Sequence, residues 1–277
     1  MAGPGAARTP ARRWLLPLGL AAACQVDAPD LGGYQFACDD SAAGACPSGQ
    51  VCQDGLCVST PAGDAGDPDA ASDPSLIAHL PLDVIDGDLT PDIVGPHEAS
   101  CSAGACPVPE GGKIGGALSF DGVDDGMALS SPAGLNPPAG TLSVWLYLPA
   151  HPTGGATWSV VGKAYGGDVE NSYELYVNAD GHAVLYSTAA EIAAPAPLPL
   201  ATWTHLAATW GEDTLRLFVA GEEVGSAAGT PMFDGSPVLL GMDRNDGSSD
   251  SFLPGRLDDL RIHDRALSPG EIAALAE

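Results

Sequence analysis

The sequence predicts an all-β protein, in which an antiparallel sandwich ends in one short C-terminal helix and follows a small disulfide-rich knot and a flexible linker. From Ser75 onward, short apolar or alternating runs are separated by Gly, Pro, Asn and Asp, with no long helical period between them. The 277 residues include 36 Gly, 25 Pro and 7 Cys, as in loop-rich exported proteins. Because 45% of the residues are hydrophobic and only 17% are charged, the chain can bury a core.

Strands are expected where apolar runs lie between turn residues. These runs are residues 76–82, 117–120, 126–129, 141–148, 158–163, 173–178, 182–187, 203–210, 215–219, 238–242 and 256–263. Residues 178–181 are expected to close a hairpin, because Gly181 tolerates the positive φ that such a turn needs. Turns at residues 211–213 and 220–221 make residues 203–224 a three-strand meander.

The chain is expected to end in a short helix. Ser268 and Glu271 have the spacing of a capping box, and Pro269 occupies the first helical position. The apolar residues that follow continue this helix towards Glu277.

The first 23 residues are predicted to be an export signal. Three arginines precede the apolar run 14–20, which is too short to span a bilayer. The run leads into Ala21–Cys24, which resembles the bacterial lipobox, although Leu20 lies one place early. Lipidation of Cys24 would leave six cysteines, an even number for disulfides, whereas plain secretory cleavage, the alternative, would leave an odd thiol.

Residues 24–58 are predicted to hold the lipidated cysteine and a small knot. Cys38, Cys46, Cys52 and Cys57 lie in a segment too short to build a hydrophobic core, so disulfides are expected to hold it together. Three connectivities are possible, and we favour the interleaved pairs Cys38 with Cys52 and Cys46 with Cys57. A zinc site, the alternative, would need short C-x2-C spacings. The spacing resembles small EGF-like knots.

Residues 59–74 are predicted to form a disordered linker. The segment contains only Asp, Ala, Gly, Pro, Ser and Thr, so it offers almost no apolar surface to bury. The knot and the linker together would hold the sandwich domain of residues 75–277 away from the lipid.

Five segments of this domain resemble the LamG-like domains of the concanavalin A-like jelly-roll superfamily, of the laminin G-like 3 type. They are residues 115–125, 141–145, 203–207, 217–221 and 255–272. The resemblance extends from about Leu76 to Glu277 and implies a jelly-roll sandwich. Ala220 departs from the family pattern, which usually has Asp before this Gly.

Carboxylates are in excess, with 36 Asp and Glu against 10 Lys and Arg and a net charge of -26. An acidic chain of this kind is not expected to bind nucleic acid. Oxygen ligands on loops suit Ca²⁺, and many members of the family hold this ion. Asp121 and Asp258 lie in the family's two most characteristic acidic motifs and are the expected ligands. The alternative is that the acidic clusters are only solvated turns.

Two loops are the candidate ligand surface. One supplies Tyr165, Asp168 and Asn171, and the other supplies Asp243, Arg244 and Asn245. Sugars are commonly held by such combinations of ring stacking and polar groups. The alternative is that both are mobile polar loops. Cys101 and Cys106 are expected to close a further loop by a disulfide.

The expected function is that of a non-catalytic binding module for carbohydrate or protein, anchored to the membrane by lipid and displayed at the outer membrane or cell surface. Gln25 replaces the Asp that often retains lipoproteins at the inner membrane. A periplasmic or secreted protein is the alternative location. The chain has no G-x-S-x-G motif and no E-x-D-x-x-E strand of related glucanases, so no enzyme is expected. A structural envelope component and, less favoured, a glycan-active enzyme are the alternative functions.

Overall fold

The computed structural model describes residues 50–53, 56–59, 73–130, 132–167, 169–245 and 247–277, and it divides the chain into one unit up to Val58 and another from Ser59. In the first unit, strands β1 (Gln50–Gln53) and β2 (Leu56–Ser59) pair with each other. The predicted signal, Cys24, Cys38 and Cys46 lie outside the described residues, as do the side chains of Cys52 and Cys57. Lipidation and the knot disulfides therefore stay predictions.

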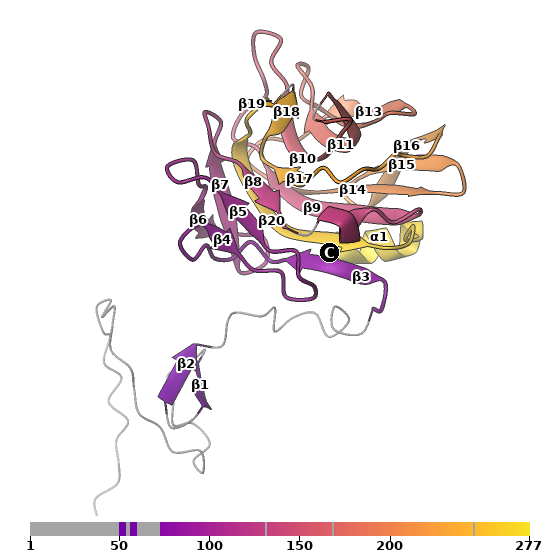
Figure 1. Cartoon of the computed structure of the whole chain (residues 1–277). Helices are drawn as coiled ribbons and strands as arrows, with labels where there is room; N and C mark the ends of the chain where they lie inside the picture. Colours follow the sequence, from indigo (N-terminus) through magenta and orange to yellow (C-terminus); the bar gives the residue numbers. More distant parts are fainter. Residues whose placement is uncertain (1–49, 54–55, 60–72, 131, 168, 246) are drawn as a thin grey trace, which may run out of the picture. The chain divides into compact units, whose positions relative to one another are not determined.

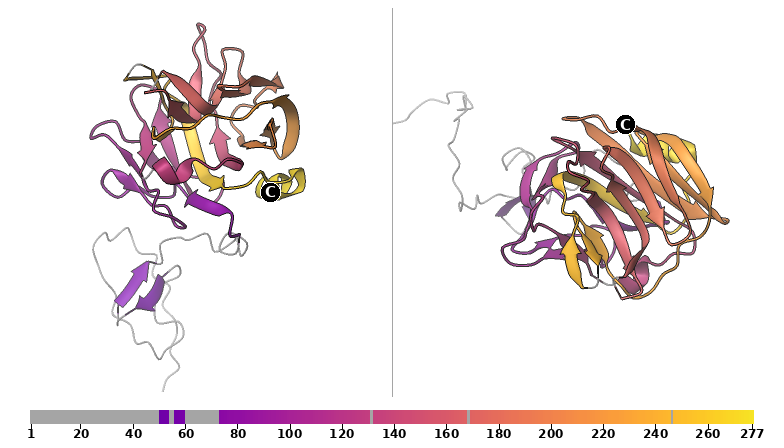
Figure 2. Two further views of the ribbon diagram at one scale, coloured as in Figure 1. Left: turned by 45° about the vertical axis from the view of Figure 1, so that its right-hand side comes forward. Right: turned by 90° about the horizontal axis from the view of Figure 1, so that it is seen from above.

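The second unit is a sandwich of two antiparallel sheets, as the sequence predicts (Figures 1 and 2). Sheet I has the strand order β13 (Glu191–Pro197), β12 (His182–Ser187), β11 (Glu170–Val177), β10 (Trp158–Tyr165), β17 (Val238–Leu240), β8 (Met127–Leu129), β5 (Ala99–Cys101) and β4 (Leu89–Thr90). Sheet II has the order β16 (Glu222–Ala228), β15 (Thr214–Val219), β14 (Trp203–Gly211), β9 (Gly140–Tyr147), β20 (Pro254–His263), β7 (Gly116–Asp121) and β6 (Val108–Gly111), and β3 (Leu76–Leu80) pairs with β20.

The core fills the space between the two sheets. Alternate residues of each strand point inward, such as Leu142, Val144 and Leu146 of β9, and all three are buried. Burial of one such side chain stabilises the fold by about 1.5 to 3 kcal/mol. Trp210 of sheet II stacks on Tyr173 of sheet I with ring centroids 4.9 Å apart, so aromatic contact joins the sheets.

Each apolar run expected to be a strand is one, with ends that differ by a few residues. The sequence did not predict β4, β5, β6, β13 or the hairpin of β18 (Asp243–Asn245) and β19 (Ser248–Asp250). These strands are short, polar or interrupted by proline. β13 and β6 are edge strands, where proline is tolerated because one side of the backbone needs no partner.

The expected turns are present and use positive φ angles. Gly181 has φ +82° between β11 and β12, and its N–H donates to the carbonyl of Asn178 over 2.9 Å. Ala220 and Gly221, in the turn between β15 and β16, have φ angles of +51° and +83°. Because Ala carries a Cβ, it adopts this conformation at a cost that Asp or Asn would reduce.

Helix α1 (Pro269–Leu275) begins at the predicted capping box. The Ser268 hydroxyl accepts the N–H of Glu271, whose carboxylate accepts the N–H of Ser268 over 2.8 Å. Ile272 packs on Phe218 and thereby covers part of the outer face of sheet II. Among the described residues, no helix has both the length and the apolar character needed to cross a membrane.

One disulfide joins Cys101 to Cys106, which confirms the pairing expected for these two residues. Cys101 ends β5, a strand of three residues that pairs with β4 and β8. The bond closes the short loop that follows this strand and limits its freedom in the unfolded chain.

Candidate functional site

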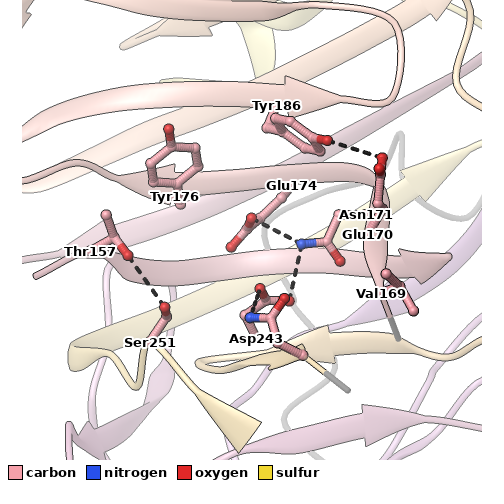
Figure 3. A pocket seen from close by; sticks show the side chains of 10 residues that line it. Thr157, Val169, Glu170, Asn171, Glu174, Tyr176, Tyr186, Asp243 and Ser251 are labelled. Carbon is pink, nitrogen blue, oxygen red and sulfur yellow. Dashed lines mark hydrogen bonds between the residues drawn. The ribbon is translucent and has the colours of Figure 1, made fainter. Parts of the chain in front are cut away.

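A pocket of about 470 Å³ lies on sheet I beside the β18–β19 hairpin (Figure 3). This volume is within the range of small-molecule sites. Its lining is polar and aromatic and consists of Thr157, Val169, Glu170, Asn171, Glu174, Tyr176, Tyr186, Asp243, Asn245 and Ser251. We refer to it below as the sheet I pocket.

The strand pattern of β11 places the lining residues on the outer face of the sheet. Tyr173, Leu175 and Val177 belong to the core, so Glu174 and Tyr176 between them point outward. Lys163 of β10 is opposite Tyr173, whereas the next residue, Ala164, is opposite Asn171. Ser172 therefore forms a bulge, and the bulge brings Asn171 to the same face as Glu174.

Carboxyl and amide groups alternate along one wall of the sheet I pocket. The amide nitrogen of Asn171 donates to Glu174 Oε2 over 3.1 Å and to Asp243 Oδ1 over 3.0 Å. Asn245 in turn donates to Asp243 Oδ2 over 3.1 Å and to Asp250 Oδ2 over 3.0 Å. This carboxyl–amide chain, formed by these five residues, fixes the hairpin against β11, and Figure 3 shows its links from Glu174 through Asn171 to Asp243.

Two tyrosines provide the aromatic part of the pocket. Tyr186 of β12 donates to Glu170 Oε2 over 3.3 Å, and Tyr176 of β11 donates to Glu191 Oε2 over 3.4 Å. Tyr186 is directly opposite Glu174 in the strand register. Each ring is half-buried and has its hydroxyl held by a carboxylate, so the rings have fixed places at the pocket.

Burial and like charge dominate the electrostatics. Glu174 is only 8% exposed, and burial together with the nearby Asp243 raises its pKa to about 8. Burial and the Glu191 carboxylate raise the pKa of Tyr176 to about 12. Burial and a different carboxylate, that of Glu170, raise the pKa of Tyr186. At neutral pH Glu174 therefore carries a proton for most of the time, and both tyrosines stay neutral.

The structure brings together three of the six residues that the sequence predicts as ligand-binding. Asn171, Asp243 and Asn245 come from the two predicted loops and meet in the sheet I pocket. Tyr165 and Arg244 are not among the lining residues; the Tyr165 hydroxyl lies 3.9 Å from the sulfur of Met232. Asp168 lies outside the described residues.

The sequence did not identify Glu174, Tyr176 or Tyr186 as site residues, because all three lie in apolar runs that predict buried strands. Their alternation with core residues is the signal that places them outside. Glu174 stands between Tyr173 and Leu175, and a carboxylate at such a position is rare in a core.

The expected pair of calcium ligands does not form one site. Asp121 is opposite Pro254 in the register of β7 and β20, and Asp258 lies four residues further along β20, about 13 Å away. Asp258 is fully buried and accepts the N–H groups of Lys113 and Ile114 over 2.6 and 2.8 Å. Asp258 is thus held in a loop contact instead of facing a shared cation site.

Asp121 lies instead with Asp124 and Asp125, and one oxygen of each carboxylate is within 4.8 Å of the others. Asp121 Oδ1 accepts the N–H of Val123 over 2.8 Å. Hydrogen bonds of this kind from backbone N–H groups lower the pKa of Asp121 and hold the turn in its conformation. Three carboxylates supply only part of the six to eight oxygens that Ca²⁺ takes.

A second group of titratable residues is buried on the outer face of sheet II. His79 Nε2 lies 2.6 Å from Asp259 Oδ1, and Arg261 Nε donates to Asp259 Oδ2 over 2.9 Å. His205 lies edge-on to Trp145, and burial lowers its pKa to about 4. These side chains are paired or packed, and we call them the sheet II polar layer.

Solved structures with the same fold include the sialidase of Trypanosoma rangeli in complex with 2,3-difluorosialic acid, at a TM-score of 0.58 and 14% identity over 73% of this chain and 33% of that one. The binding domain of Paraclostridial Mosquitocidal Protein 1 also matches, at a TM-score of 0.58 and 16% identity over 73% of this chain and 52% of that one.

This chain therefore spans about a third of the length of the sialidase it matches, and identities this low establish the fold alone. A comparison with curated protein sequences finds no match. Residues 121–273, more than half of the 277-residue chain, match the model of the concanavalin A-like lectin/glucanases superfamily named Laminin_G_3. The match agrees with the jelly-roll sandwich and with the resemblance in the sequence, and the chain belongs to this superfamily.

Proposed function

We propose that this protein is a lipid-anchored, non-catalytic surface module that binds carbohydrate in the sheet I pocket. The observation that carries the proposal is the combination of Tyr176 and Tyr186 with the carboxyl–amide chain around one pocket. Aromatic rings stack on the apolar faces of sugars, and carboxyl and amide groups bind pairs of sugar hydroxyls.

The rigid setting of these groups supports binding. Each hydroxyl or amide of the lining is held by a neighbour, so little side-chain freedom is lost when a ligand enters. The similar solved structures, a sialidase with a bound sugar derivative and the binding domain of a mosquitocidal protein, are consistent with this function but are distant proteins.

A glycan-active enzyme is the second candidate, because Glu174 and Asp243 are close and the pKa of Glu174 is raised to about 8. Retaining glycosidases place two carboxyl groups about 5 to 5.5 Å apart on either side of the bond they break. Here the amide nitrogen of Asn171 is hydrogen-bonded to both carboxyl groups. That nitrogen occupies the place where the sugar carbon would have to stand, which favours binding without catalysis.

A glycan array with the purified chain tests the proposed function. We expect a subset of glycans to be retained by the wild type and lost on Asn171→Ala, with no release of reducing sugar on long incubation. Asn136→Ala removes an amide that contacts Asp234 outside the pocket and serves as the matched control. Retention of no glycan would contradict the proposal and leave a structural envelope component. Release of sugar that stops on Glu174→Gln would establish the enzyme.

Anchoring is a separate part of the proposal and rests on the sequence around Cys24. We expect the mature protein to carry a lipid on this residue and to fractionate with the outer membrane, and Cys24→Ser to block processing or release the protein. Mass spectrometry of the mature N-terminus is the measurement. A lipid-free mass in both forms would contradict lipidation and favour a periplasmic or secreted protein.

A further inference from the structure

The lining of the sheet I pocket is rich in acceptors and in negative charge. Glu170 and Asp243 contribute carboxylates, Glu174 contributes a carboxyl group that is mostly protonated at neutral pH, and none of the described lining residues is Lys, Arg or His. Arg244 stands between two lining residues in β18 but does not itself line the pocket. A pocket lined by one sign of charge concentrates ligands of the opposite sign and opposes ligands of the same sign.

Asn171 provides independent evidence that the pocket is built to receive a hydrogen-bond donor from a ligand. This side chain is 7% exposed, and its amide nitrogen is fully used by Glu174 and Asp243. Its Oδ1 is buried and has no hydrogen-bond partner among the described residues. Turning the amide round would bring Oδ1 against the carboxylate oxygen of Asp243. A buried acceptor without a donor is unfavourable, and a donor on the ligand would relieve this cost.

We infer that the sheet I pocket selects a sugar that carries a free, positively charged amino group over the neutral and acidic forms of the same sugar. This inference rests on the proposed carbohydrate binding. An ammonium group has three N–H donors and no acceptor, so it matches a wall on which Asn171 Oδ1 and the Asp243 carboxylate are acceptors and Glu174 offers its carbonyl oxygen. A uronate or another acidic sugar would bring a carboxylate against the carboxylates of Glu170 and Asp243.

The two tyrosines favour an amino sugar over a lysine side chain of a protein. Tyr176 and Tyr186 present half-buried rings beside the acceptors, and a ring of this kind stacks on the flat apolar face of a pyranose. A lysine stem is thin and would leave most of the 470 Å³ pocket unfilled. The amino group of the sugar therefore matches the acceptors of the lining, and the sugar ring matches the two tyrosine rings.

Calorimetry with three matched oligosaccharides tests the inference. The probes are the β-1,4-linked tetramers of glucosamine, N-acetylglucosamine and glucuronate, each measured at pH 6 and in 0.5 M NaCl to suppress unspecific attraction to the acidic protein. We expect the glucosamine tetramer to bind at least tenfold more tightly than the N-acetyl form, and the glucuronate tetramer not to bind.

Two variants assign the effect to the pocket. Asp243→Asn keeps one acceptor oxygen but removes the charge, and it should weaken glucosamine binding at least tenfold more than it weakens N-acetylglucosamine binding. Asp264→Asn removes the same charge from an exposed position after β20 and should change neither. Circular dichroism melts confirm that both variants are folded.

The outcomes separate the inference from the proposed function. Equal or tighter binding of the neutral or acidic tetramer, or equal loss in Asp264→Asn, would overturn the selection for an amine and leave carbohydrate binding intact. Tight binding of a lysine-rich peptide with no binding of any tetramer would overturn both and point to a protein ligand. Failure of all probes, together with an empty glycan array, would overturn both as well.

Discussion

The two sheets of the sandwich carry similar chemistry on their outer faces but use it differently. On sheet II, Asp259 is buried between His79 and Arg261, and every carboxylate oxygen of Asp259 has a cationic or imidazole partner. On sheet I and the adjoining β18–β19 hairpin, Glu174 and Asp243 are almost as buried, yet they have no cationic partner in the hydrogen bonds described above, are joined to the amide of Asn171 and line a pocket.

This difference teaches that burial and a shifted pKa do not by themselves identify a ligand site. His205 and Glu174 both have strongly shifted pKa values, and burial is the main cause for each. His205 packs on Trp145 in the sheet II polar layer, whereas Glu174 faces space that a ligand can fill. Buried atoms without a partner occur on both faces, as Asn171 Oδ1 on sheet I and His79 Nδ1 and His205 Nδ1 on sheet II, so it is the pocket that marks the functional face.

The largest effect is expected on the free energy of unfolding when the sheet II polar layer is changed. Asp259→Asn keeps the shape of the residue and tolerates its φ of +52°, but it removes the negative charge that lies 2.9 Å from the buried Arg261. We expect the free energy of unfolding to fall by about 3 to 5 kcal/mol, measured by urea denaturation. Glu191→Gln, on the exposed edge of sheet I, should cost less than about 0.5 kcal/mol. A loss below about 1 kcal/mol for Asp259→Asn would show that the sheet II layer is not structural.

The next effect is a pH dependence that comes from Glu174. Its pKa is about 8 in the folded protein and close to 4.5 when unfolded, so between these values the folded state binds the extra proton. Stability from this group is therefore full below about pH 4.5 and is lost as pH rises towards 8, by at most about 1.4 kcal/mol per pH unit.

Glu174→Gln, which cannot titrate, isolates this effect. We expect the variant to gain stability relative to the wild type as pH is raised from 5 to 8, in parallel urea titrations. A constant difference over that range would mean that Glu174 is solvated or paired, and the sheet I pocket would then resemble an ordinary polar surface.

A smaller effect is expected on binding alone. Tyr186→Ala removes a ring from the sheet I pocket without touching the core and should weaken binding of the best glycan about tenfold, with a melt within about 2 °C of the wild type. Tyr147→Ala removes a half-buried ring of sheet II that packs on Trp203 and should leave affinity unchanged. Equal losses in the two variants would place the binding face elsewhere.

The smallest effect is expected from calcium. We propose that Asp121, Asp124 and Asp125 hold a weak Ca²⁺ site with a Kd of about 1 mM, a value found for extracellular modules. At 1 mM Ca²⁺ this adds about 0.4 kcal/mol to the free energy of unfolding. Asp124→Asn should remove the gain and Asp258→Asn should not. The melts need high monovalent salt, and no shift there would leave the group as a solvated turn.

Most of the fold, but only part of the site, follows from the sequence. Apolar runs and turn glycines predict the strands because burial and positive φ are local requirements of the chain. The pairing of Asn171 with Asp243 depends on a bulge at Ser172 and on a short polar hairpin, and neither has a local apolar signal. The same limit explains Asp121 and Asp258, since their motifs are local but their separation is set by the register of β7 and β20.

The most direct test of the central claim is to map a bound sugar onto the two faces. An amide chemical-shift titration with the best glycan from the array reports contacts residue by residue on the intact protein. We predict that the shifts gather at Asn171, Glu174, Tyr186 and Asp243 and leave His79, His205 and Arg261 unmoved. Shifts concentrated on the sheet II residues, or spread evenly over both faces, would contradict the assignment of the sheet I pocket as the binding site.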